Sequence, residues 1–177
     1  MKKIGVNILF IITILGIYYL QSNFFNWFTI AGVMPNIFVI FIVFVGLFTN
    51  KYTGVIYGII VGVILDTLLG QVVGINMIAY SLVAILAIVF DKNFSKDSRA
   101  TITVMIIAAT LIFEVVSIIC SYIILHINVD LWIFIKTLLI ETIFNLIITI
   151  IIYPLFQNVG EIVENEYKGS QVLTRYF

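Results

Sequence analysis

The stretch GVIYGIIVGVILDTLLG, residues 54–70, has a small or acidic residue at every fourth position of an apolar segment: Gly54, Gly58, Gly62, Asp66 and Gly70. Because a step of four residues turns a helix by about 400°, these positions form one slowly drifting ridge. Glycines on such a ridge let a second helix approach to backbone contact, as small residues do inside membranes. A carboxylate in hydrocarbon needs protein or trapped water around it, so the ridge is predicted to face inward.

The composition indicates a multi-span membrane protein. Hydrophobic residues make up 63% of the 177 residues and charged residues 10%, with a mean hydropathy of +1.23, whereas soluble domains average about 25% charged residues. Six apolar segments predict an all-α integral membrane protein with six transmembrane helices in one bundle. The expected spans are about 4–20, 30–48, 53–69, 75–90, 100–126 and 131–156, followed by a cytoplasmic tail over 157–177.

The distribution of basic residues predicts the orientation. With six spans, eight of the nine lysines and arginines fall on the side of the two termini, and only Lys136 falls on the other side. Basic residues accumulate in cytoplasmic segments, so both termini are expected in the cytoplasm. The aromatic segment from Phe24 to Phe28 fits an interfacial belt on the outer side.

Polar residues also form ridges in the last two spans, where Glu114 and Ser117 share one helical face and Glu141 and Asn145 share another. Polar groups in hydrocarbon need partners, so these faces are predicted to turn inward. Three interpretations stay open: a hydrogen-bonded bundle core, a small-solute cavity lined by Asp66, Glu114 and Glu141, or a polar contact surface for a partner's transmembrane helix. If Asp66 is only a buried hydrogen-bonding group, Asp66→Asn, which keeps its size, is expected to be tolerated.

The residues that usually carry catalysis are scarce. Cys120 and His126 are the single cysteine and the single histidine, which is too few for a transition-metal cluster of such ligands. The glycines follow helical spacing and do not form a phosphate-binding loop. We therefore expect no enzyme, no cofactor, no catalytic or metal site, and no nucleic-acid partner.

An ordered set of short motifs resembles the signature of the MreD family, the rod shape-determining membrane proteins of the bacterial elongation machinery. The motifs are Pro35-Asn36, the spaced glycines ending in Leu65-Asp66, and Gly74-Ile75-Asn76. The resemblance covers the whole chain, and its distinctive part lies between residues 35 and 80. The expected helix-packing and family-motif residues are Pro35, Asn36, Gly54, Gly58, Gly62, Asp66, Gly70, Gly74 and Asn76, and the expected buried polar residues are Glu114, Glu141 and Asn145.

This resemblance implies a non-enzymatic scaffold in the bacterial cytoplasmic membrane that controls rod shape and organises peptidoglycan synthases. The partners that it implies are an MreC-like single-pass protein, an MreB-like actin homologue, a RodA-like glycosyltransferase and a class B penicillin-binding protein. The fold is expected to be similar to the six-helix substrate-binding components of energy-coupling-factor transporters. The alternative function is therefore a substrate-binding subunit for a vitamin-type small molecule.

One feature separates the two functions. The transporter subunits typically present an alanine-x-x-x-alanine face on the first helix, whereas residues 4–20 contain Gly5 and Gly16 but no alanine. The outer segments also lack the charged residues expected to hold a water-soluble vitamin. Both observations favour the scaffold.

Overall fold

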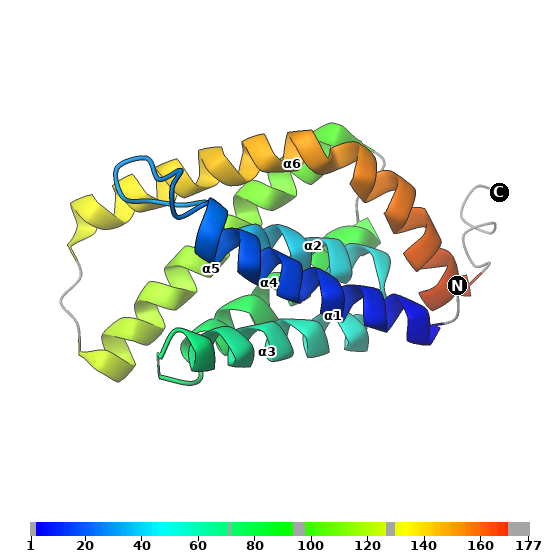
Figure 1. Cartoon of the computed structure of the whole chain (residues 1–177), viewed down its shortest axis with the longest axis horizontal. Helices are drawn as coiled ribbons and strands as arrows, with labels where there is room; N and C mark the ends of the chain where they lie inside the picture. The colour runs from blue at the N-terminus through cyan, green and yellow to red at the C-terminus, as the bar shows by residue number, and fades with distance from the viewer. Residues whose placement is uncertain (1–2, 71, 94–97, 127–129, 170–177) are drawn as a thin grey trace.

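The computed structural model describes residues 3–70, 72–93, 98–126 and 130–169, and in them six α-helices form one bundle (Figure 1). Within these ranges no β-strand occurs, and the one isolated bridge joins Ile30 to Val33. The predicted all-α class is thereby confirmed. The helices are α1 (Lys3–Tyr19, extended by the π-helical turn η1, Leu20–Phe24), α2 (Ile37–Phe48), α3 (Lys51–Leu68), α4 (Ile75–Asn93), α5 (Arg99–Leu125) and α6 (Leu131–Tyr167).

Successive helices run in opposite directions, which gives the bundle two distinct ends (Figure 1). We call the end where α1 begins and α6 finishes the terminal end, and the opposite end, where α5 finishes and α6 begins, the hairpin end. In the described part of the chain five helices are long and apolar enough to cross a membrane, and the sixth, α2, is apolar but has only 12 residues. At about 1.5 Å per residue α2 is about 18 Å long, which is short of the roughly 30 Å of a hydrocarbon core.

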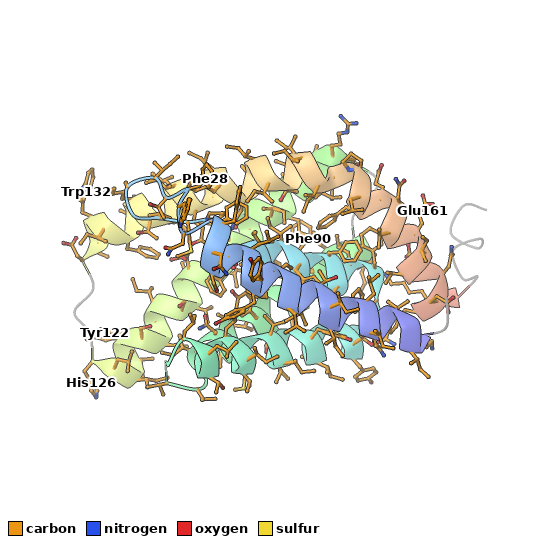
Figure 2. All side chains as sticks on the ribbon, viewed as in Figure 1. Phe28, Phe90, Tyr122, His126, Trp132 and Glu161 are labelled. Atoms are coloured by element: carbon orange, nitrogen blue, oxygen red, sulfur yellow. The ribbon has the colours of Figure 1, made fainter. Side chains whose placement is uncertain are left out.

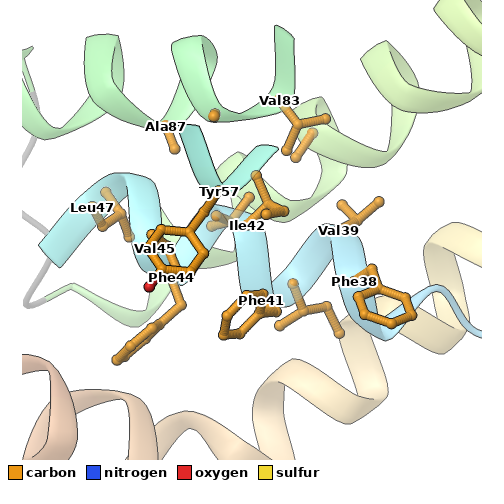
Figure 3. Packing of buried hydrophobic residues seen from close by; sticks show 14 of the residues in the cluster. Phe38, Val39, Phe41, Ile42, Phe44, Val45, Leu47, Tyr57, Val83 and Ala87 are labelled. Carbon is orange, nitrogen blue, oxygen red and sulfur yellow. The ribbon is translucent and has the colours of Figure 1, made fainter. Parts of the chain in front are cut away.

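The short helix α2 forms the centre of the bundle, because every residue from Phe38 to Phe48 is buried. Figure 3 shows Phe41 and Phe44 on one side of α2, with Val83 and Ala87 of α4 on the other. On the first side, the Phe44 ring packs edge-on against Phe156 of α6 at a centroid distance of 4.7 Å. On the second side, a Cβ at Gly46 would stand 2.6 Å from the Cβ of Ala87.

The second helix begins at Ile37, which corrects the expected start at about Ile30. Proline at position 35 has a fixed φ and no N–H, and it disfavours helical geometry in the residue before it. Asn36 then forms the N-cap, because its side chain accepts a hydrogen bond from the Val39 N–H at 3.3 Å. Upstream, Ala31 and Gly32 have positive φ angles of 55° and 82°, which no helix accommodates.

The last helix continues to Tyr167, so residues 157–167 of the expected tail are helical, and residues 170–177 lie outside the described part. Pro154 lies inside α6, where it removes one backbone hydrogen bond, and the helix changes direction near there (Figure 1). Beyond this bend α6 packs against the end of α2, where a Cβ at Gly160 would stand 2.5 Å from the Phe48 ring. This buried contact with α2 explains why α6 continues beyond the end of the uninterrupted apolar sequence.

Helices α3 and α4 are in close contact along the glycine ridge. A Cβ at Gly58 would lie 2.8 Å from the Tyr80 carbonyl oxygen, and one at Gly62 would lie 2.3 Å from the Met77 Cα. Both neighbours are backbone atoms, which cannot move aside as a side chain can. Gly70 departs from the expected ridge: it follows the end of α3 with φ +63° and has no atom within 4 Å of an added Cβ. Its role there is the left-handed turn that ends the helix.

Candidate functional site: a buried polar centre

A hydrogen-bonded polar cluster lies where α2 begins. The Asn36 side-chain oxygen accepts a bond from the Tyr80 hydroxyl at 3.0 Å, and the Asn36 N–H donates to Asn145 Oδ1 at 2.8 Å. Asn145 Nδ2 in turn donates to Thr110 Oγ1 at 3.0 Å. All four residues are buried. Asn36 and Asn145 are 109 positions apart in sequence, so this cluster joins the start of α2 to helices α4, α5 and α6.

This cluster explains how the backbone can be irregular so deep in the bundle. The position of Asn145, fourteen residues into α6, places the start of α2 about 21 Å along that helix. Non-helical backbone at such depth is tolerated only where protein satisfies its polar groups. The Asn145 amide satisfies the Asn36 N–H, which has no partner within α2.

Two carboxyl groups adjoin this cluster. Glu141 of α6, 6% exposed, lies within electrostatic and hydrogen-bonding reach of Glu114 of α5, Asn36 and Asn145. Its Oε1 atom is buried and has no hydrogen-bond partner. Among the described residues no basic side chain contributes to the surroundings of Glu141. The Asn36 and Asn145 amides lie beside the carboxyl group, but they leave its Oε1 atom without a donor.

Asp66 forms a second polar group, at the hairpin end of α3. Its two oxygens accept bonds from the Gly74 N–H at 2.8 Å, the Asn76 N–H at 3.0 Å, the Asn76 amide at 2.9 Å and the Met77 N–H at 3.3 Å. These donors are the first turn of α4 and the residue before it, so the carboxylate caps α4 from another helix. The side chain is fully buried. The Leu65-Asp66 and Gly74-Ile75-Asn76 motifs thus form one structural unit.

The residues singled out from the sequence consequently fall into three places. Gly54, Gly58 and Gly62 lie along the α3 ridge; Asp66, Gly74 and Asn76 form the cap of α4; and Asn36, Glu114, Glu141 and Asn145 surround the start of α2. Asp66 does not share hydrogen bonds with Glu114 and Glu141, because its own bonds all go to the start of α4, so a cavity lined by all three acids is not favoured. In the part of the chain that the structure describes, no group of three or more His, Cys, Asp or Glu residues has a metal-binding arrangement.

Sequence reasoning missed several contacts at the terminal end. Lys168, considered a tail residue, donates to the Leu47 carbonyl at 2.6 Å and to Asp91 Oδ2 at 2.7 Å. It thereby caps the end of α2. Asn7 accepts hydrogen bonds from the hydroxyls of Tyr57 (3.1 Å) and Tyr167, which joins α1 to α3 and α6. A lone asparagine in an apolar first span was the available signal for the second contact.

The fold and the polar centre together define a multi-pass membrane protein, in whose described residues hydrogen bonds between polar residues hold one central helix among five longer ones. A comparison with models of protein families identifies the family. The model of the rod shape-determining protein MreD matches residues 1–159, and the chain belongs to that family. No curated protein and no solved structure matches the chain.

Membership in this family associates the protein with the determination of rod shape in bacteria and with the cell-shape machinery. It confirms the family resemblance that the motifs between residues 35 and 80 indicated.

Proposed function

We propose that this protein is a non-enzymatic scaffold of the bacterial elongation machinery that binds the transmembrane helix of an MreC-like single-pass protein. Through that partner it would organise a RodA-like glycosyltransferase and a class B penicillin-binding protein, together with the MreB-like filament. The observation that carries the proposal is the nature of the exposed surface. Long apolar side chains are exposed along α1, α3, α5 and α6, so the surface available for recognition is an intramembrane one.

The proposal places the protein in the cytoplasmic membrane with both termini in the cytoplasm. Of the six described lysines and arginines, Lys3, Lys51, Lys92, Arg99 and Lys168 lie at the terminal end of the bundle. Only Lys136 lies near the hairpin end. The terminal end should therefore face the cytoplasm.

A labelling experiment tests this orientation. In a background with Cys120→Ser, the exposed residues Glu161 and Thr29 are each replaced by cysteine, because they lie near opposite ends of the bundle. A membrane-impermeant thiol reagent applied to spheroplasts should label Thr29→Cys, and should label Glu161→Cys only after lysis. The reverse pattern would refute the orientation.

The function is tested by deletion together with recovery of the partner. Loss of the gene should produce rounded cells, and the tagged protein extracted in mild detergent should recover the single-pass partner. The competing function, a vitamin-type substrate-binding subunit, is favoured by the unpaired oxygen of Glu141. It predicts instead a small molecule bound tightly to the purified protein and normal cell shape in the deletion strain. Those two results together would refute the scaffold and favour the transport subunit.

A further inference from the structure

The halves of α5 and α6 next to the hairpin end are not packed as their other halves are. The buried residues of α5 end at Phe113, and those of α6 begin at Glu141. Every described residue from 122 to 133 is exposed. Figure 2 shows Tyr122, His126 and Trp132 on these projecting ends.

The inward faces of these halves are only half-buried. The buried face of α5 continues at helical spacing beyond Phe113, and that of α6 extends from Glu141 back toward its start. We call these two surfaces the hairpin faces; their members are Val116, Ser117, Cys120, Ser121, Phe134, Thr137 and Leu138, all of intermediate exposure.

The reason for this incomplete packing is the length of α2. It begins at Ile37, level with Thr110 of α5 and Asn145 of α6, so α2 does not extend between the hairpin faces. The loop that precedes α2 does not bury itself there, because residues 26–32 are all exposed. Among the described residues a central helix therefore fills the terminal half of the bundle, and no helix takes the same position in the hairpin half.

The two glutamates lie at the inner limit of the hairpin faces. Glu114 is three residues before Ser117 on α5, and Glu141 is four residues after Thr137 on α6, so each is one turn from a hydroxyl on its own helix. The unpaired Oε1 atom of Glu141 is the buried acceptor nearest to these faces along α6. Lipid chains offer it no donor, whereas a side chain from another helix can.

From these observations we infer that the hairpin faces are the docking site for the partner's transmembrane helix, which donates a hydrogen bond to the Glu114–Glu141 pair. The inference rests on the proposed function and adds the site and the chemistry of recognition. The docking helix must carry a hydroxyl, amide or basic side chain at the depth of the pair, and small or apolar residues toward its outer end. It takes the place that α2 leaves empty.

Two pairs of variants test the site by co-expression with the tagged single-pass partner and by measurement of the recovered ratio of the two proteins. The first pair is Ser117→Trp and Ile119→Trp. Ser117 is on the hairpin face, whereas Ile119 is 50% exposed and lies about 200° around the same helix. The Ser117 variant should lose most of the partner, and the Ile119 variant should recover it at the wild-type ratio.

The second test removes the acceptor. Glu141→Met keeps the length of the side chain, and partner binding should weaken about three- to fifteen-fold, which is the range for one interhelical hydrogen bond in a membrane. The melting temperature of the variant alone should change by less than about 4 °C, because the unpaired buried acceptor is removed together with the polar contacts that Glu141 makes with Asn36 and Asn145. Thr142→Val, on the same helix with only its own-helix bond to Leu138, is the matched control.

The outcomes separate the site from the function. Wild-type recovery of the partner by both Ser117→Trp and Glu141→Met would overturn the docking site and leave the scaffold intact. Failure of the wild-type protein to recover the partner would overturn both. Recovery of a second copy of this chain, lost in Ser117→Trp, would show that the hairpin faces form a homodimer and would also overturn the inference. A fall of more than about 4 °C in the melting temperature of Glu141→Met, with unchanged partner recovery in Ser117→Trp, would assign Glu141 to the core alone and overturn the inference.

Discussion

Asp66→Asn tests whether the carboxylate is required as the cap of α4. The carboxylate accepts four hydrogen bonds, two at each oxygen: Asn76 donates two to Oδ1, and the backbone N–H groups of Gly74 and Met77 donate to Oδ2. Asparagine has one oxygen, so in either orientation of its amide two donors lose their acceptor and face an NH₂ group. At about 1.5 kcal/mol for each lost bond to a charged acceptor, the variant should unfold more easily by about 3 kcal/mol. That is a change of roughly 100-fold in the unfolding equilibrium.

The measurement is unfolding of the purified protein in mild-detergent micelles by titration with sodium dodecyl sulfate, followed by circular dichroism. Asp130→Asn is the control, since Asp130 caps α6 with bonds to the N–H groups of Trp132 (2.9 Å) and Ile133 (3.3 Å) but is exposed. Asparagine is as good an N-cap as aspartate, so this control should lose less than about 0.5 kcal/mol. Equal stability of the two variants would refute the assignment of Asp66 as a buried cap. The four hydrogen bonds of Asp66 therefore predict a less stable Asp66→Asn variant, whereas the sequence alone predicts a tolerated one if Asp66 is only a buried hydrogen-bonding group.

Three further variants can be followed in the same titration. Gly62→Ala should lower the free energy of unfolding by about 1–3 kcal/mol, because the added Cβ meets the α4 backbone. Gly16→Ala, with open space around it, should be neutral or stabilising. Equal effects of the two variants would exclude a packing role for the ridge. Asn145→Leu should cost about 2–4 kcal/mol, since it removes two buried bonds and leaves the Asn36 N–H unpaired; a neutral result would show that water replaces the amide. Lys168→Met should cost about 1 kcal/mol and speed proteolysis beyond the bend of α6, because the cap on Leu47 is lost; unchanged proteolysis would show that aromatic packing alone holds that segment.

Local periodicity explains which parts of the fold were predictable. The four-residue spacing of the glycines can be read from one segment of sequence. It predicts that another apolar helix packs closely against α3 at these glycines. In the structure that helix is α4, which contacts Gly58 through the backbone of Tyr80. Gly46 and Gly160 also make close approaches, to Ala87 and Phe48, but each is a single glycine in its helix and carries no periodic signal.

The polar residues were predictable as buried but not as partners. A glutamate or asparagine in an apolar segment must avoid lipid, and this much follows from the cost of desolvation. Which residue it meets depends on helix order and depth, as the bond between Asn36 and Asn145 across 109 positions illustrates. Asp66 and the α4 residues that it caps are close in sequence. This cap could still not be predicted, because it depends on where α4 begins and on its first N–H groups pointing toward α3.

The sequence by itself determined the class of the protein, the number of its helices and the residues that could not face lipid, because composition and helical period depend only on the chain. Only the tertiary structure decided that α2 is a short central helix and that α6 continues past Pro154 to Tyr167. The physical reason is that the transfer of apolar side chains out of water is favourable whether lipid or protein then surrounds them. Hydrophobicity therefore cannot tell a helix that spans the membrane from one that other helices enclose.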